Sequence, residues 1–377
     1  MNQATRIVLD AMGGDRAPAV PVQAAWLAAA RGLEVELVGP QEILEQRLQE
    51  VRAASAQLTP GKDAADIATH LQIVPASEWI TMDEHPVEAL RRKPQASLLV
   101  AARRVAADPQ KAALVSAGNT GAVLAATLFT WKRLPGIERP ALGTFLPTAR
   151  GGRTLLVDAG ANVDCRPLQL VQFAAMGWAF VQALGVSQPA GIGLLNIGAE
   201  PGKGNEVAQK TFLVLQSSGL PFAGNVEGMD VWSGKVAVVV CDGFVGNVLI
   251  KSAEGLVDAL LRVLSHAGPG QVRTPADSPA GSGTGHWSSV LQAFDWNEIG
   301  GAPLLGLNGV GIVAHGRSSP KALLAAMELA DRLVREALPA RLGEALDNLR
   351  HGADSDARRE SRAAAGEQSV KGDEGCH

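Results

Sequence analysis

Glycine-rich clusters that carry Asn, Asp, Ser or Thr end several short apolar runs of this chain, and they are its first candidates for chemistry. DAMGGD at 10–15 follows RIVL, and SAGNTGA at 116–122 follows ALV. Backbone N–H groups that open a helix attract anions, because unsatisfied donors and the helix dipole point the same way. SAGNTGA suits this role best, since the helix-forming AVLAATLFTW continues from it. The alternative is a tight turn in which Asn119 or Thr120 caps the helix.

Further clusters of this kind add amide, hydroxyl, amine and carboxylate groups. They are VDAGANVD at 157–164, NIGAEPGKGNE at 196–206, GNVEG at 224–228, CDGFVGN at 241–247 and AHGRSS at 314–319. The donors are Ser116, Asn119, Thr120, Asn162, Lys203, Asn205, Asn225, Asn247 and Lys251, the carboxylates are Asp10, Asp15, Asp158, Asp164, Asp242 and Glu227, and His315 is the one histidine in such a loop. A single carboxylate caps a helix, braces a loop or acts as acid, base or lysine partner. Several such loops together indicate an anion site, because helix capping does not need them all.

Motifs for nucleotides, metals and activated nucleophiles are missing from the sequence. GKG at 202–204 lacks the upstream glycine and the Ser/Thr of a P-loop, and no G-x-G-x-x-G follows the first apolar run. H-E-x-x-H, C-x-x-C and G-x-S-x-G are also absent. We therefore expect no metal and no cofactor. Cys241 directly follows VAVVV and is expected to be a buried core thiol.

The clusters sit where β-branched apolar runs end and helix-period segments begin, from RIVLD at 6–10 to VGIV at 310–313. Such alternation predicts an α/β protein with a mostly parallel sheet covered by helices on both faces. In parallel sheets ligands bind outside the carboxyl ends of the strands. The clusters should therefore gather on one side of the molecule.

Two regions depart from this alternation. Leu249, Leu256, Leu260 and Leu264 recur at helical spacing before the Pro/Gly/Ser-rich segment 267–286, and helical spacing resumes after it. This predicts a helical hairpin over about 248–298 with a flexible tip at 267–286. Residues 1–350 are expected to form one catalytic unit, and the polar, charged tail at 351–377 is expected to be disordered.

Composition narrows the class of protein. The chain has 377 residues, 46% of them hydrophobic and 19% charged, and a formal net charge of -4. Its mild acidity gives no reason to expect nucleic acid as a partner. Three widely spaced cysteines are typical of a reducing compartment, and neither a secretory signal nor an apolar run of about 18 residues is visible. The expected location is cytoplasmic, with attachment to a membrane surface left open.

Eight segments in order resemble the bacterial phosphate acyltransferase family of phospholipid synthesis, the PlsX family. They are DAMGGDRAP at 10–18, SAGNTGA at 116–122, RPALGTFLPT at 139–148, VDAGANVDC at 157–165, NIGAEPGKGNE at 196–206, GNVEG at 224–228, CDGFVGN at 241–247 and GGAPLLGLNG with AHGRSS at 300–319. The resemblance covers residues 6 to about 335.

The resemblance implies that inorganic phosphate attacks the thioester of long-chain acyl-acyl carrier protein to give acyl phosphate and free carrier protein. It implies a homodimer with a three-layer α/β/α fold similar to isopropylmalate dehydrogenases and phosphotransacetylases. It also implies a functional link to a membrane glycerol-3-phosphate acyltransferase, and peripheral membrane contact through the hairpin.

On this basis we assign site residues as hypotheses. Lys203, Asn162, Asn225, Asp242 and Asn247 are the catalytic candidates, with Lys203 holding phosphate and one of the three asparagines facing the oxyanion. The candidates for phosphate and substrate binding are Gly13, Gly14, Asp15, Ser116, Gly118, Asn119, Thr120, Gly121, Asp164, Asn205, Glu227, Lys251 and His315. Arg91, Arg92 and Lys93 are a candidate contact for the acidic carrier protein, or simply a solvated helix face.

Three positions depart from the usual pattern of the family. Ala96 precedes Ser97 where two serines are usual, Ala199 replaces an acidic residue before Glu200, and Val245 stands where threonine is common. Two other functions stay open: a phosphotransacetylase-like activity on short acyl-CoA, and a non-catalytic acyl-carrier or membrane adaptor. The hairpin either packs in the core or a dimer interface, or contacts a membrane.

Overall fold

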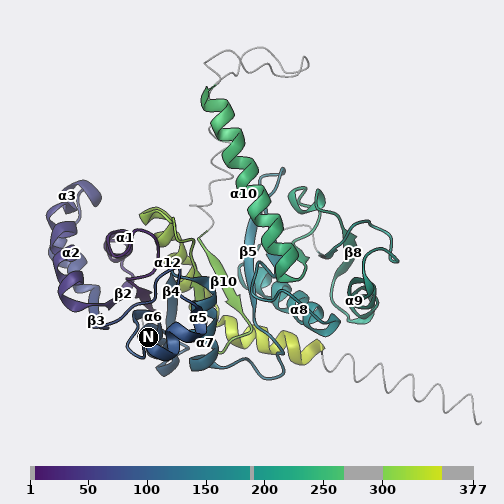
Figure 1. Cartoon of the computed structure of the whole chain (residues 1–377), viewed down its shortest axis with the longest axis horizontal. Coiled ribbons are helices and arrows are strands. Elements are labelled where there is room, and N and C mark those ends of the chain that lie inside the picture. Colours follow the sequence, from purple (N-terminus) through teal and green to yellow (C-terminus); the bar gives the residue numbers. More distant parts are fainter. Residues whose placement is uncertain (1–4, 187–190, 267–299, 350–377) are drawn as a thin grey trace, which may run out of the picture.

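An 11-stranded sheet runs through the computed structural model, which describes residues 5–186, 191–266 and 300–349 (Figure 1). Its spatial order is β3-β2-β1-β4-β11-β10-β5-β6-β9-β7-β8. The strands are β1 (Arg6–Asp10), β2 (Glu34–Gly39), β3 (Leu71–Pro75), β4 (Ala112–Ser116), β5 (Ala141–Pro147), β6 (Arg153–Val157), β7 (Ile192–Leu195), β8 (Phe222–Val226), β9 (Val238–Val240), β10 (Ala302–Leu305) and β11 (Val310–Val313). The predicted strand runs therefore all lie in one sheet.

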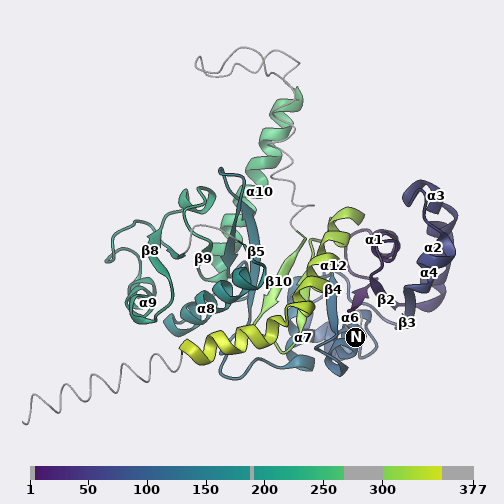
Figure 2. The same cartoon turned by 180° about the vertical axis from the view of Figure 1, so that it is seen from behind.

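Helices cover both faces of this sheet (Figures 1 and 2). They are α1 (Ala19–Ala29), α2 (Gln41–Ala53), α3 (Ser55–Leu58), α4 (Ala64–Thr69), α5 (Pro86–Arg92), α6 (Ser97–Ala107), α7 (Thr120–Trp131), α8 (Pro167–Ala183), α9 (Glu206–Ser217), α10 (Gly243–His266) and α12 (Pro320–Arg335), with the short 3-10 helix η1 at Asp230–Trp232. One core cluster joins the sheet to α1, α8 and α12, and another joins it to α6 and α7. The order helix, sheet, helix confirms the predicted three-layer α/β/α class.

The sheet consists of two parallel halves that run in opposite directions. Parallel pairing joins β3, β2, β1, β4 and β11, and separately joins β6, β9, β7 and β8. The antiparallel strands β10 and β5 lie between the halves. Central strands such as β4 are buried along their whole length, which explains their continuous apolar sequence.

The register makes the carboxyl ends of the two halves meet. Ile312, one residue before the end of β11, pairs with Pro303, and Val157 at the end of β6 pairs with Gly143. The pairing of Leu304 with Leu142 sets Pro303 beside Gly143, so all four residues share one row. The glycine clusters after β4, β11, β6 and β9 therefore gather at the middle of the sheet, whereas the sequence predicted that they gather on one side of the molecule.

The first helix of the predicted hairpin is present as α10. It starts at Gly243, earlier than expected, and packs Leu249 and Ile250 against the sheet. Its later part extends beyond the body of the protein (Figure 1) and exposes Leu256 and Leu260. The tip at 267–286, the second helix of the hairpin and the tail at 351–377 lie outside the described residues.

Candidate active site

The loops after β1 and β4 are joined by a buried cluster of hydroxyl and carboxylate groups. The Ser97 and Ser116 hydroxyls donate to the two oxygens of Asp10, at 2.6 and 2.8 Å, and the Met12 N–H donates at 3.3 Å. Burial raises the pKa of Asp10, and the two serine hydrogen bonds oppose that rise. Ser116 thus holds the end of β4 against the end of β1, and Ser97, which Ala96 precedes in place of the family's usual serine, joins the start of α6 to the same carboxylate.

Gly13 allows these two loops to approach closely. A Cβ atom at this position would lie 2.7 Å from the Gly118 nitrogen and 2.9 Å from the Ser116 hydroxyl. The neighbouring Gly14 has a φ of +104° that favours glycine. Asp15 donates its N–H to the Gly316 carbonyl at 2.9 Å, which adds the loop after β11 to the same group.

The predicted anion loop opens α7. The Asn119 side chain accepts from the Ala122 N–H at 3.2 Å and donates to the Met82 carbonyl at 3.1 Å, so Asn119 caps the helix. This arrangement leaves the N–H groups of Thr120 and Gly121 without an acceptor among the described residues. Asn119 therefore caps the helix, and the N–H groups of Thr120 and Gly121 remain free to donate to an anion.

Asp158 organises the loop after β6. Its carboxylate accepts N–H groups from Leu142, Gly160, Ala161 and Asn162 at 2.7–3.1 Å, and the Asn162 side-chain amide at 2.8 Å. Burial raises the pKa of Asp158 above its ordinary value, and these hydrogen bonds oppose that rise without cancelling it. From the sequence, Asp158 could be recognised only as a carboxylate at the end of a strand. The segment VDAGAN was the sequence feature that indicated this turn.

The start of α10 packs against that loop with almost no space between them. A Cβ at Gly246 would lie 1.9 Å from the Asp158 carbonyl oxygen, and the Gly243 N–H donates to the Asn162 carbonyl at 2.7 Å. Asp242 caps this end of the helix by accepting the Val245 N–H at 2.8 Å. A Cβ at Gly160 would lie 3.5–3.7 Å from Asn247.

The facing loops enclose a cavity of about 380 Å³, called here the central cavity. Four predicted site residues line it, and they come from both halves of the sheet: Thr120, Asn247, Lys251 and His315. The other lining residues are Leu142, Thr144, Ala159, Gly160, Ile250, Glu254, Gly301, Ala302, Val313, Ala314, Ser318 and Ala322.

Polar groups of the central cavity are held in place by their neighbours. Lys251 pairs with Glu254 at 2.6 Å. The Arg317 N–H donates to His315 Nδ1 at 3.1 Å, so a neutral His315 carries its proton on Nε2. The Lys251 amine with its partner Glu254, a ring N–H, an amide and the backbone N–H of Thr120 thus belong to residues that line one space that can hold an anion.

Other predicted residues lie outside this cavity. The Asn162 amide is buried and donates to the Pro140 carbonyl and Asp158, both at 2.8 Å, so it has no N–H left for an oxyanion. Asn205 caps α9 through the Ala208 N–H, Asn225 donates to the Glu200 carbonyl at 2.8 Å, and Glu227 lies in a turn with Asp230. Lys203 lies 4.0 Å from Glu200 and is not among the residues of the described chain that line the central cavity. In this structure Lys251, not Lys203, is the lysine that shares the cavity with Thr120.

The basic stretch at the end of α5 is partly engaged within the protein. Arg92 pairs with Glu88 at 2.9 Å, and Lys93 pairs with Glu84 at 2.7 Å. Arg91 is exposed. Its role as a carrier contact stays a prediction.

Neither thiol in the described part of the chain is activated. Burial raises the pKa of Cys165 to about 12, with Asp158 and Asp242 adding to the effect. Burial raises the pKa of Cys241 well above its ordinary value too, as expected for a core thiol. Within the described ranges, no three His, Cys, Asp or Glu side chains are grouped so that they could hold a metal ion.

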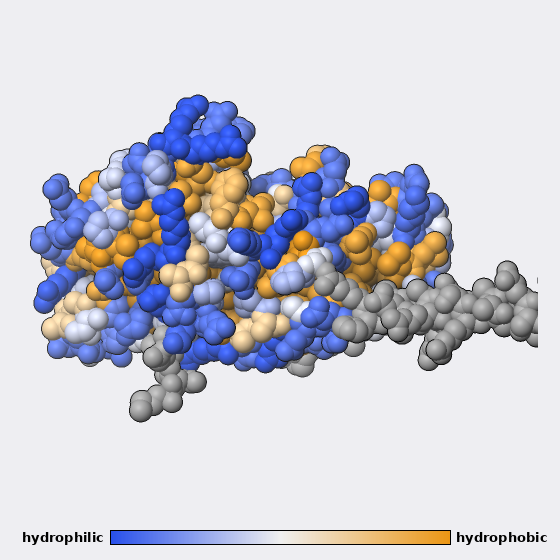
Figure 3. Space-filling model, turned by 90° about the horizontal axis from the view of Figure 1, so that it is seen from below, coloured by the Kyte–Doolittle hydropathy of each residue, from blue (hydrophilic) through white to orange (hydrophobic). Residues whose placement is uncertain are grey.

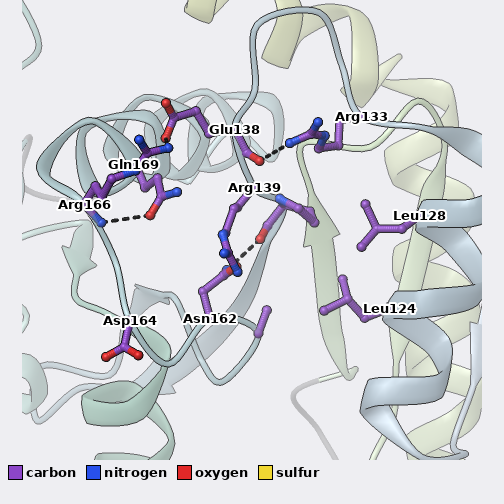
Figure 4. Close-up of a pocket in the computed structure, with 11 residues that line it drawn as sticks. Leu124, Leu128, Arg133, Glu138, Arg139, Asn162, Asp164, Arg166 and Gln169 are labelled. Carbon is purple, nitrogen blue, oxygen red and sulfur yellow. Dashed lines mark hydrogen bonds and ion pairs between the residues drawn. The ribbon is translucent and has the colours of Figure 1, made fainter. Parts of the chain in front are cut away.

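A second cavity, of about 650 Å³, lies at the far end of α7 (Figure 4) and is called here the arginine cavity. Leu124 and Leu128 form one wall, and Arg139 and Asn162 face them across the space (Figure 4). Its remaining lining residues are Arg133, Glu138, Pro140, Ala161, Asp164, Arg166 and Gln169. Of the predicted site residues, Asp164 and Asn162 belong here. Arg139 was missed, although it stands in the RPALGTFLPT segment.

Comparison with solved structures first defines the class of fold. A phosphotransacetylase from Streptococcus pyogenes superposes with a TM-score of 0.53 at 16% sequence identity, covering 89% of this chain and 95% of that one. At this identity the likeness concerns the fold alone, which is an α/β/α arrangement.

Sequence relatives then give the family. A model described as fatty acid synthesis protein matches residues 5–341. Phosphate acyltransferases from Desulforamulus reducens and Myxococcus xanthus are 42% and 43% identical, covering 91% and 90% of this chain and 98% and 94% of their own lengths. The chain therefore belongs to the fatty acid synthesis protein family and is an enzyme of the acyltransferase class, which confirms the predicted membership.

Proposed function

We propose that this enzyme transfers a long-chain acyl group from the thioester of acyl carrier protein to inorganic phosphate, as a step of phospholipid synthesis. The single observation that carries the proposal is the central cavity, where donors from two opposed strand-end loops surround one space. Its volume of about 380 Å³ has room for a phosphate and a thioester carbonyl together.

Phosphate binding is assigned to the start of α7 and the facing side chains. The unpaired N–H groups of Thr120 and Gly121 and the positive end of the α7 dipole favour an anion there. Lys251, which pairs with Glu254, adds an ammonium group, and His315 adds the N–H of Nε2. Several fixed donors thus hold the nucleophile in place.

The chemistry needs positioning more than it needs a base. A phosphate oxygen forms a bond to the thioester carbon, the carbon–sulfur bond breaks, and the proton of hydrogen phosphate passes to the departing thiolate. A thiol of pKa roughly 8.5 is a good leaving group, so little acid catalysis is required. The Asn247 amide, which lines the cavity beside Gly160, is the donor available to the developing oxyanion.

The test is an assay for acyl phosphate, with purified enzyme, palmitoyl-carrier protein and inorganic phosphate. Hydroxylamine trapping of the product, with and without a chelator, should show phosphate-dependent turnover that the chelator does not change. Retained carrier binding with no acyl phosphate would instead indicate the non-catalytic adaptor.

The competing activity is phosphate-dependent turnover of a short acyl-CoA, which the phosphotransacetylase-like fold and the same anion loop would also serve. Parallel assays with acetyl-CoA and palmitoyl-carrier protein separate the two. Higher kcat/KM for acetyl-CoA would overturn the long-chain assignment.

The cellular setting is part of the same proposal. We infer a homodimer that works at the cytoplasmic face of the membrane and hands its product to a membrane glycerol-3-phosphate acyltransferase. The described residues form no helix that is long and apolar enough to cross a membrane. Exposed apolar side chains on α10 support either dimer contact or peripheral attachment.

A further inference from the structure

The central cavity and the arginine cavity are lined by neighbouring residues of the same three segments, and the two together are called here the groove. Thr120 lines the first cavity, and Leu124 and Leu128 line the second, at intervals of four residues on one face of α7. In the β5 segment, Leu142 lines the central cavity and Pro140, two residues earlier, lines the arginine cavity. In the loop after β6, Gly160 lines the central cavity and Asn162 lines the arginine cavity. From Thr120 to Leu128 this groove runs about 12 Å along the helix.

The far end of the groove is basic. Arg166 pairs with Glu138 at 2.7 Å, and Arg133 donates to the Glu138 backbone carbonyl. Arg139 is exposed and has no hydrogen-bond or ion-pair partner among the described residues. Its side chain lies next to Asn162, across the space from Leu124 and Leu128 (Figure 4). The groove thus offers an anion-binding loop at one end, leucine side chains in the middle and a free guanidinium at the other end.

We propose that this groove holds the phosphopantetheine arm of acyl carrier protein, with the thioester at Thr120 and the phosphodiester at Arg139. The inference rests on the proposed function and deepens it by assigning the path of the substrate. The arm has a thioester at one end, a phosphodiester at the other and no charge between them. The groove has the proposed reaction site at one end, Arg139 at the other and uncharged leucine side chains between them. Guanidinium groups bind phosphate through paired N–H donors, which suits Arg139 to the anionic end.

An acyl chain would match this groove less well. It would place its apolar end among Arg133, Arg139 and Arg166, and would strip water from charged groups without giving them a partner. The carrier protein then docks over the rim of the arginine cavity, where these three exposed arginines outnumber the nearby Glu138 and Asp164. Neither Arg91 nor Arg92 on α5 is among the residues that line this cavity.

The test compares thioesters that carry or lack the phosphodiester. Palmitoyl-carrier protein and palmitoyl-CoA carry the pantetheine phosphate, whereas S-palmitoyl-N-acetylcysteamine ends before it. For Arg139→Ala, the ratio of kcat/KM for palmitoyl-carrier protein to that for the truncated thioester should fall about tenfold or more, because a charge-assisted hydrogen bond is lost. The fall should appear in KM and not in kcat, and Arg139→Lys should restore part of it.

The matched control is Arg150→Ala, which removes another exposed arginine from the turn between β5 and β6, outside the groove. Its ratio should equal that of the unchanged enzyme. An equal effect of Arg139→Ala on both thioesters, or none on either, would overturn the inference. An effect confined to palmitoyl-CoA would overturn the carrier assignment. An unchanged enzyme that turns over none of the three thioesters would contradict the proposed function itself.

Discussion

At the scale of single residues, Asp10 is held in a way that makes its protonation part of the stability of the protein. It is buried with Ser97 and Ser116 as hydrogen-bond donors, and burial raises its pKa above the ordinary value of 3.8. A carboxyl group whose pKa is raised in the folded state stabilises the fold while protonated. That contribution is complete below the unfolded pKa and is lost as the pH rises through the folded pKa.

Asp10→Asn should therefore change the pH dependence of stability. The free energy of unfolding of the variant, relative to that of the unchanged protein, should increase as the pH rises from about 4 to 8, because asparagine does not ionise. Urea unfolding at several pH values measures this difference. A difference independent of pH would show that the raised pKa of Asp10 does not contribute to stability.

The two lysines that the sequence offered for phosphate binding differ in position. Lys251 lines the central cavity, whereas Lys203 lies near Glu200 in the loop after β7. Lys251→Ala should raise the KM for phosphate about tenfold, as expected for the loss of one charge-assisted contact, and Lys251→Arg should retain most of the affinity. Steady-state kinetics with varied phosphate measure the effect.

Lys203→Ala is the matched comparison. It should change the KM for phosphate less than Lys251→Ala does. The reverse order would return the phosphate contact to Lys203, as the sequence first indicated.

At the scale of elements, the position of α10 depends on Gly246, whose lack of a side chain lets the helix pack against the loop after β6. A Cβ at Gly246 would meet the Asp158 carbonyl at 1.9 Å, so Gly246→Ala has to move the helix or the loop. We expect a loss of about 3 kcal/mol in the free energy of unfolding, from overpacking. Activity should fall as well, because Asn247 and Lys251 follow on the same helix.

Gly255 on the same helix provides the control. An added Cβ there meets nothing within 4 Å, so Gly255→Ala should stabilise the protein by about 0.5–1 kcal/mol through helix propensity. Thermal and urea unfolding of both variants check the contrast. Equal effects of the two substitutions would contradict the close approach of α10 to Asp158.

The elements were predictable from the sequence, but their directions were not. Buried strands such as β1 and β4 can be recognised from their continuous apolar composition. The cap at Asn119 can be recognised from its residue type and from its position directly before a helix. An apolar run has the same composition whichever way it is paired, so the antiparallel strands β10 and β5 left no signal. The choice between Lys203 and Lys251 depended on where α10 lies relative to α7, which only long-range packing determines.

At the scale of the whole molecule, the opposed halves of the sheet explain how distant segments of the chain form one site. Thr120 and His315 come from one half, and Asn247 and Lys251 come from the helix that follows the other half. The face in Figure 3 shows apolar patches interrupted by hydrophilic residues. Helix α10, in contrast, exposes Leu256, Leu260 and Val263 by 62%, 50% and 65% on its extended part.

These three side chains lie at helical spacing on one face, and we expect the proposed homodimer to bury them. Burial of apolar surface stabilises association by about 25 cal/mol per Å², so Leu256→Ser with Leu260→Ser should shift the protein from dimer to monomer. Sedimentation velocity over a range of concentrations measures the shift. Leu213→Ser on α9, which removes a side chain of 64% exposure, should leave the dimer intact. A double variant that remains dimeric but no longer floats with anionic vesicles would assign this face to the membrane instead.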